Sequence, residues 1–152
     1  MEDIKYSKEN IKFALRVGAI SYDKNKEKVL LFRGNDMNFY MLPGGKIKEF
    51  ETSEEAVIRE VKEELGYTDI KFDYTGVSED IVDKLKVHQV TINYKGIFEK
   101  EILDNEFTSI ESDWIRFKWF NIDELDNIEI HPKNIVNMIK NETNHIIEKI
   151  DM

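Results

Sequence analysis

The chain of 152 residues predicts an α/β layered domain, and three features of its sequence lead to this prediction. Runs of apolar and β-branched residues, typical of strands, occur on both sides of one central stretch. The central stretch repeats its apolar residues at helical spacing between a capping pattern and a glycine. A second helical pattern occupies the C-terminal end. Such an order of strands and helices is typical of α/β layers, and the length fits one domain spanning residues 1–152.

Three strands are expected before the central helix. Residues 11–22 (IKFALRVGAISY) and 28–33 (KVLLFR) are rich in β-forming residues, and a polar turn separates them. A shorter strand is expected at 38–42 (NFYML). Pro43 and the two glycines that follow it then predict a turn, because both residue types interrupt regular structure.

The central helix is expected from Ser53 to Leu65. Thr52 and Glu55 form the T-x-x-E pattern of a capping box, and Gly66 supplies a C-terminal stop. Four apolar residues recur on one face at helical spacing: Ala56, Val57, Val61 and Leu65.

After this helix the pattern predicts further strands and a final helix. Strands are expected at 70–78 and 88–98, joined by a polar loop or hairpin crossing at 79–85. An acidic, mobile loop is expected at 99–113, followed by a short strand at 117–120 and a helical turn at 122–125. The last helix is expected from Lys133 to Ile150, because an apolar stripe runs along it.

Three carboxylates share one face of the central helix. At 3.6 residues per turn, Glu60, Glu63 and Glu64 lie within an arc of about 100° and repel one another. A hard divalent cation makes such a cluster favourable, because Mg²⁺ takes oxygen ligands. Arg59 can pair with Glu55 and Glu63, four residues away on either side, and so hold this face in one arrangement.

The stretch from the glycine turn to Gly66 resembles the Nudix box, G-x5-E-x7-R-E-U-x-E-E-x-G-U, in which U is a bulky apolar residue. Eight residues fall at the required spacing: Gly45, Glu51, Arg59, Glu60, Val61, Glu63, Glu64 and Gly66. Tyr67 stands where an aliphatic residue is usual, so the box spans residues 45–67 with one departure. The resemblance implies the Nudix fold, a mixed β-sheet sandwiched between α-helices. The stretch Trp119-Phe120-x-x-Asp123-Glu124-Leu125 is similar to the tail of many members.

The resemblance also implies roles for the acidic residues. Glu60, Glu63 and Glu64 would bind Mg²⁺ or Mn²⁺ and activate water, with either Glu60 or Glu63 free to act as the base instead. The Gly44 carbonyl would be a further ligand. Glu51 and Arg59 would form a supporting pair beside the structural glycines Gly45 and Gly66.

A more distant acid completes the site in many members of the family. Glu111 has the expected distance before Trp119, and Asp113, Glu99 and Glu101 compete with it.

Candidate substrate contacts are cations and one asparagine. Arg16, Arg33, Lys46 and Lys48 can meet phosphates, and the two lysines stand beside the glycine turn. Asn134 resembles a base-reading asparagine of family members that act on oxidised nucleotides. Phe39, Tyr40 and Trp119 can stack on a base, although a position in the core is the simpler expectation.

Composition narrows the partners and the compartment. The net charge of −9 disfavours nucleic acid, and no local Lys/Arg cluster is evident in the sequence, so neither DNA nor RNA is expected as a partner. The chain has no cysteine, no apolar run long enough to span a membrane, and no signal-peptide pattern at its start. A cytoplasmic protein without a membrane partner is therefore expected. The oligomeric state stays open, a homodimer included.

The resemblance as a whole implies a Mg²⁺-dependent pyrophosphohydrolase. It would cleave a phosphoanhydride bond in a nucleoside diphosphate linked to another group. Nucleoside triphosphates, ADP-ribose or nucleotide sugars, and dinucleoside polyphosphates all remain open as substrates. The alternative is a Nudix-like module that binds or senses a nucleotide without turnover, although such modules often lose glutamates of the box and this chain keeps them.

Overall fold

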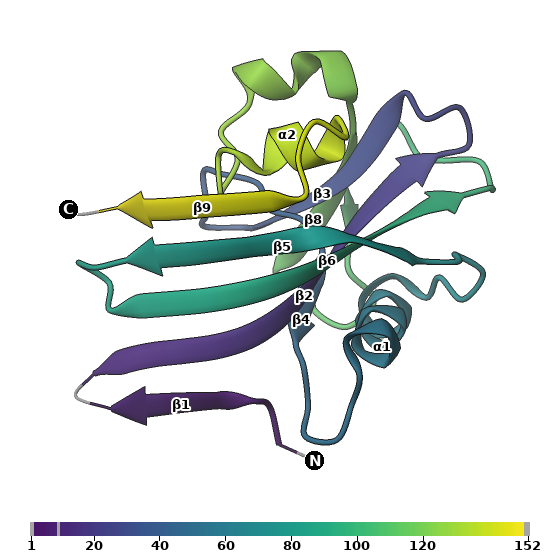
Figure 1. The fold of residues 1–152 in the computed structure, drawn as a ribbon. Coiled ribbons are helices and arrows are strands. Elements are labelled where there is room, and N and C mark those ends of the chain that lie inside the picture. The colour runs from purple at the N-terminus through teal and green to yellow at the C-terminus, as the bar shows by residue number, and fades with distance from the viewer. Residues whose placement is uncertain (1, 9, 151–152) are drawn as a thin grey trace.

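A computed structural model describes residues 2–8 and 10–150 of the chain. Figure 1 shows a bent sheet with helix α1 (Ser53–Leu65) on one side and helix α2 (Ile135–Ile139) on the other. A 3₁₀ helix, η1 (Ile122–Asn127), precedes α2. The strands are β1 (Lys5–Lys8), β2 (Ile11–Asp23), β3 (Lys28–Gly34), β4 (Gly44–Lys46), β5 (Asp73–Val82), β6 (Val87–Phe98), β7 (Phe107–Thr108), β8 (Ile115–Asn121) and β9 (His145–Ile150).

Strand β2 pairs with four other strands: β1, β3, β4 and β6. The strand order is β7-β8-β3-β2-β6-β5-β9, and β1 and β4 also pair with β2. The β2–β6 and β5–β9 pairs are parallel, whereas the other pairs are antiparallel, so the sheet is mixed as expected. Because β2 is long, its start pairs with β1, its middle with β4 and its end with β3. The site built on β4 and α1 is therefore anchored to the centre of the fold.

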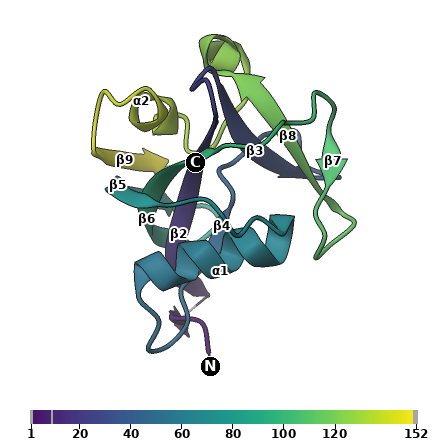
Figure 2. The same cartoon turned by 90° about the vertical axis from the view of Figure 1, so that its right-hand side faces the viewer.

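The two faces of the sheet bury two separate apolar cores. Under α1 the core contains Val57, Val61 and the fully buried Phe117, whereas under α2 it contains Ile20, Leu125 and other residues. Figure 2 shows α1 in front of β2 and β4, and α2 beside β9 at the upper left. This arrangement confirms the predicted layers of helix, mixed sheet and helix.

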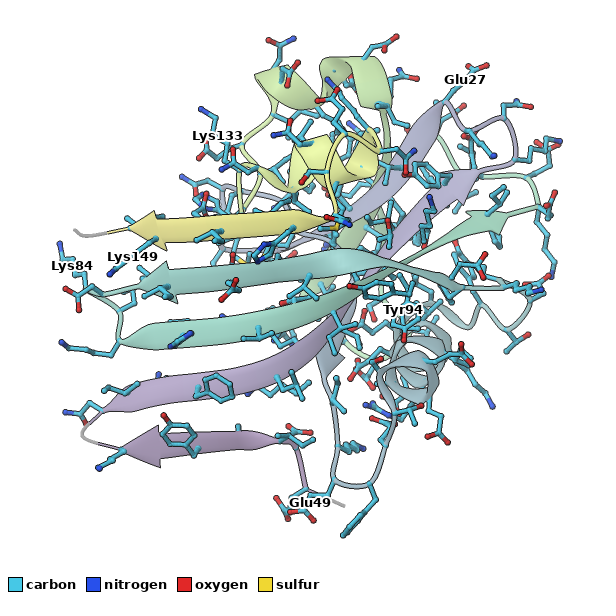
Figure 3. The ribbon with its side chains drawn as sticks, viewed as in Figure 1. Glu27, Glu49, Lys84, Tyr94, Lys133 and Lys149 are labelled. Carbon is cyan, nitrogen blue, oxygen red and sulfur yellow. The ribbon has the colours of Figure 1, made fainter. Side chains whose placement is uncertain are left out.

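Helix α1 begins and ends where the sequence predicts. The Thr52 side chain accepts a hydrogen bond from the Glu55 N–H, and the Glu55 carboxylate accepts one from the Thr52 N–H. Gly66 ends the helix in the left-handed region at φ 75°, which glycine adopts without strain. Ser53 and Tyr94 of β6 share a hydrogen bond of 2.6 Å, and Figure 3 shows Tyr94 next to α1. In the described part of the chain, no helix is long and apolar enough to cross a bilayer.

The glycine turn of the sequence is a strand in the structure, and the strand expected at 38–42 is absent. Residues 38–42 form only isolated bridges, from Met41 to Phe32 and from Tyr40 to Ile130. Gly44, by contrast, pairs with Gly18 of β2 as the first residue of β4. A Cβ on Gly44 would collide with the Val17 carbonyl oxygen, so the glycine allows β4 to approach β2 closely.

The loop predictions at 79–85 and 99–113 are also partly wrong. Strand β5 continues to Val82, which pairs with Val87, so only four residues form the turn of this hairpin. Polar residues are tolerated there because side chains alternate between the two faces of a strand. The acidic stretch 99–113 contains the short strand β7, which pairs with β8.

The C-terminal helix prediction is wrong beyond Ile139. Asn141 adopts a left-handed φ of 61°, which breaks the helix, and residues 145–150 continue as β9 alongside β5. The apolar stripe misled the prediction because isoleucines spaced four apart satisfy both a helical and an alternating pattern. In the strand, Ile146 is buried with 3% exposure, whereas Ile147 is exposed at 60%.

This alternation can be tested with two neighbouring substitutions. We expect Ile146→Ala to lower the free energy of unfolding by about 2–4 kcal/mol, because it leaves a cavity in the core under α2. Ile147→Ala should change it by less than about 0.5 kcal/mol. Urea unfolding of both variants measures the difference, and equal losses would contradict the strand assignment.

Candidate active site

The guanidinium of Arg59 holds three carboxylates at once. It pairs in a bidentate manner with Glu51, through Nε at 2.6 Å and Nη2 at 2.9 Å. Its Nη1 donates to Glu60 at 2.9 Å and to Glu63 at 3.3 Å, and its Nη2 also donates to the Lys46 carbonyl at 3.1 Å. The expected Glu51–Arg59 pair is therefore present. The expected Arg59–Glu55 pair is replaced by it, because Glu55 is engaged in the helix cap.

Glu60 lies against the backbone of β4. A Cβ on Gly45 would collide with the Glu60 carboxylate, so the glycine makes room for it. The side chain of Glu60 is only 13% exposed. Burial raises the pKa of Glu60, the Arg59 guanidinium opposes that rise, and the charges of Glu63 and Glu111 add to it.

Glu64 is the acid of this face that receives no hydrogen bond from Arg59 among the described contacts. Burial, followed by the charges of Glu60 and Glu111, raises the pKa of Glu64 to about 9, and the charge of Arg16 only partly opposes this. Such a carboxyl is stable in the ionised form only when a cation approaches it. Glu64 is therefore the acid that most needs a positive partner.

Glu111 reaches the cluster through the segment that precedes β8. The Glu64 carbonyl accepts hydrogen bonds from Ser109 Oγ at 2.9 Å and from the Ile110 N–H at 3.0 Å. The Glu111 N–H in turn donates to Ser109 Oγ at 3.2 Å. These bonds dock the segment on the end of α1, and the Glu111 charge raises the pKa values of both Glu60 and Glu64. Sequence reasoning missed Ser109, which is buried although it lies in an acidic stretch.

Arg16 connects this cluster to the rest of the sheet. It lies on β2 opposite Lys46 of β4, and burial lowers its pKa while the charges of Glu60, Glu64 and Asp80 oppose that effect. Arg16 therefore lies within electrostatic reach of both the acidic helix face and Asp80 on β5. A phosphate placed beside the acidic cluster would find this cation at its edge.

The donor set of the cluster fits a hard divalent cation. Carboxylate oxygens are the ligands that Mg²⁺ prefers, and a cation would offset both the repulsion and the burial of Glu60 and Glu64. Within residues 2–8 and 10–150, no three acidic or histidine side chains converge closely enough to hold an ion in the conformations seen. The physical reason is that Arg59 draws Glu60 and Glu63 toward itself.

The other predicted substrate residues are dispersed. Arg33 forms a bidentate ion pair with Glu106, with both bonds at 3.1 Å, and no described contact joins it to the acidic cluster. The Lys48 N–H donates to Glu51. Asn134 is exposed at the start of α2, and its side chain makes no capping hydrogen bond. Lys46 is better placed, because it lines a cleft together with Arg16.

A small polar pocket lies on the sheet face that α2 covers, next to Arg16. Asp80 and Asn93 line this pocket, and each has a buried side-chain oxygen, Oδ1, that lacks a partner among the described residues. Burial, followed by the charge of Glu148, raises the pKa of Asp80 to about 6. Unpaired buried acceptors are costly, so this pocket is suited to a molecule that brings hydrogen-bond donors.

Comparison with known proteins agrees with this geometry. A family model described as NUDIX domain matches residues 12–141. The mRNA-decapping enzyme subunit 2 of Saccharomyces cerevisiae is 34% identical over 112 residues; the match covers 66% of this chain, and the chain spans only 10% of that protein.

Two solved structures show the same fold. A MutT protein from Methanosarcina mazei has a TM-score of 0.64 at 22% identity, covering 90% of this chain and 96% of that one. The dihydroneopterin triphosphate pyrophosphohydrolase of E. coli has a TM-score of 0.67 at 17% identity, covering 84% and 92%.

The raised pKa of Glu64 predicts how the metal-free protein responds to pH. Between pH 5 and pH 9 the unfolded chain ionises this carboxyl while the folded chain retains its proton, so stability falls as pH rises. We expect Glu64→Gln to raise the free energy of unfolding by about 1–2 kcal/mol at pH 8 in EDTA and to leave it nearly unchanged at pH 4. Urea unfolding at both pH values measures this. Glu54→Gln, an exposed change on the same helix, is the control, and equal pH profiles for both variants would refute the expectation.

Proposed function

The chain belongs to the NUDIX domain family, and from this premise we propose that it is a hydrolase of phosphoanhydride bonds in nucleoside diphosphates linked to another group. One observation supports the proposal above all others. The fold brings Glu111, from the segment before β8, into the electrostatic field of Glu60 and Glu64 on α1. Acids on two sides of one site can bind and deprotonate water as well as hold a cation.

The metal would be Mg²⁺ or Mn²⁺, held by Glu60, Glu63 and Glu64 with the Gly44 carbonyl as a further ligand. When bound, it would withdraw charge from the phosphate oxygens and lower the pKa of water. Arg59 would not contact the substrate. Its bonds to Glu51 and the Lys46 carbonyl instead fix the positions of the acids around it.

Residues of the chain would accept the proton of the attacking water during cleavage of the phosphoanhydride bond. A carboxylate accepts a proton from water while the water oxygen forms a bond to phosphorus. The bond from phosphorus to the bridging oxygen breaks, and the departing phosphate keeps its electron pair. We assign the proton acceptor to Glu111, because it is exposed on a docked segment and is not tied to Arg59 among the described contacts. Glu60 and Glu63 remain the competing bases.

Substrate binding would extend from Arg16 and Lys46, which flank the cluster on β2 and β4. The pocket lined by Asp80 and Asn93 has a volume of about 30 Å³, which suits a water molecule that donates to their buried oxygens. Weaker candidates for substrate binding are Lys48, Arg33 and Asn134, because no described contact joins them to Arg16 or Lys46. The three substrate classes expected from the sequence all fit these contacts.

The alternative function is a module that binds a nucleotide without turnover. A binding module has no need for a fourth acid beside the metal ligands, whereas this chain keeps every glutamate of the box and docks Glu111 onto them. RNA is less favoured as a substrate, because the net charge is −9. The name of the yeast relative refers to a protein about ten times longer than the matched part.

Hydrolysis should depend strictly on a divalent cation. We expect a panel of nucleotides incubated with Mg²⁺ to release phosphate or pyrophosphate from at least one class of compound. Excess EDTA should abolish the release, and Mn²⁺ should restore it. Unchanged turnover in EDTA would refute the metal site. Tight binding with no turnover of any compound would favour the binding module.

The role of Glu111 is separable from that of its neighbours. We expect Glu111→Ala to lower kcat by about 10², as is typical for loss of a general base, with little change in Tm. Asp113→Ala, Glu99→Ala and Glu101→Ala, which alter exposed acids of the same acidic stretch, should each lower it less than about threefold. Small and equal effects at all four acids would assign the base to α1.

A further inference from the structure

A cleft of about 640 Å³ lies where β1, β2, β4 and β6 meet, and four cationic side chains line it. They are Lys5, Lys12, Arg16 and Lys46, and the described lining contains no acidic residue. The sequence shows no such cluster, because these residues are spread over 42 positions and come together only through strand pairing. The net charge of the chain is −9, so the charge of this cleft is opposite in sign to that of the chain as a whole.

Strand register places the four cations on one face. Lys12 and Arg16 share a face of β2 because they are an even number of residues apart. Lys46 pairs with Arg16, and Lys5 pairs with Ala14, which lies between the other two on β2. The four positive charges therefore converge on the same side of the sheet.

Two aromatic side chains of these strands, Tyr6 and Phe13, also line the cleft. Tyr6 and Phe13 pair across β1 and β2, and their rings stack with centroids 5.5 Å apart. Because side chains alternate along a strand, the two rings project from the opposite face to Lys5 and Lys12, and the lining therefore combines cations with aromatic surface. The cleft thus offers a ligand four positive charges beside one aromatic pair.

Strand β4 connects the cleft to the acidic cluster. Lys46 lines the cleft and its carbonyl accepts a hydrogen bond from Arg59 at 3.1 Å, while the neighbouring Gly45 lies against the Glu60 carboxylate. A chain of phosphates whose reacting phosphorus sits at the acidic cluster can therefore continue past Lys46 into the cleft.

A simpler role accounts for part of this cluster. Lysines on an edge strand such as β1 discourage pairing with other chains, and this explains Lys5. It does not explain Lys12 and Arg16, because β2 pairs with β1 or β4 on one side and with β6 on the other. The acids whose charges act on Arg16 are not part of the lining: Glu60, Glu64, Asp80 and Asp3. The cations of the cleft therefore have no acidic residue beside them in the described lining, which favours an anionic ligand.

We propose that this cleft is a subsite for a chain of three or more phosphates, so that the substrate is a nucleoside or dinucleoside polyphosphate. The inference rests on the proposed function. A triphosphate carries about four negative charges near neutral pH, which matches the four cations. The diphosphate bridge of ADP-ribose or a nucleotide sugar carries about two, which would leave Lys5 and Lys12 without a partner.

Binding of inorganic tripolyphosphate without metal tests the subsite directly. We expect the double variant Lys5→Gln/Lys12→Gln to weaken this binding about tenfold in calorimetry at low salt. Binding of pyrophosphate should weaken less than about threefold. The control is Lys62→Gln/Lys149→Gln, which removes the same charge from the exposed side of α1 and from β9 (Figure 3), and it should match the wild type.

The outcomes separate this inference from the proposed function. If the lysine pair weakens tripolyphosphate binding while no compound is hydrolysed, the subsite stands and the hydrolase proposal fails. The subsite is refuted if the variant Lys5→Gln/Lys12→Gln binds tripolyphosphate like the wild type and hydrolyses triphosphates and ADP-ribose at wild-type rates. The hydrolase proposal stands in that case. Tighter, lysine-dependent binding of a short single-stranded RNA than of tripolyphosphate would also overturn the assignment, in favour of RNA.

Discussion

Arg59 and the carboxylates around it are the interaction on which the candidate site depends. Four acids of like charge cannot share a small, partly buried space without a cation, and here one guanidinium satisfies Glu51, Glu60 and Glu63 together. The bidentate pair with Glu51 fixes the plane of the guanidinium, which a lysine at this position could not do. The bond to the Lys46 carbonyl then ties the helix to β4 and thereby to β2. Helix, glycine strand and central sheet are therefore held by one side chain.

The same arrangement leaves an asymmetry among the acids. Glu51 is fully engaged with Arg59, and Glu60 and Glu63 are partly engaged with it. Glu64 faces Glu60 and Glu111 instead, with Arg16 as its opposing charge. A divalent cation would therefore compete with Arg59 for Glu60 and Glu63, whereas it would meet Glu64 without such competition. The network thus holds Glu60 and Glu63 at Arg59, whereas burial and the neighbouring acids raise the pKa of Glu64.

Local rules were sufficient for the part of the fold that carries the box. The capping residues, the apolar spacing and Gly66 define α1 without help from the rest of the chain, so its bounds were predictable. The C-terminal segment was not, because its isoleucines fit two periodicities, and pairing with β5 decided between them. Likewise Gly44 and Gly45 read as a turn, since the approach of β4 to β2 is a tertiary contact that composition does not encode. Tyr67, unusual at its position, stacks on Phe98 with ring centroids 4.2 Å apart, a compensation visible only in three dimensions.

The positions of the acidic residues could be predicted from local sequence, whereas those of the cations in the cleft depend on the tertiary structure. The acids of α1 are four residues or fewer apart, so helical geometry alone places them together. The cations of the cleft come from β1, β2 and β4, and only strand register brings them onto one face. Net charge is consequently a poor guide to what this surface binds, because the acidic excess and the basic cleft occupy different elements. Arg16 lines the cleft, and its charge also opposes the rise in the pKa of Glu64, so this residue acts on both regions.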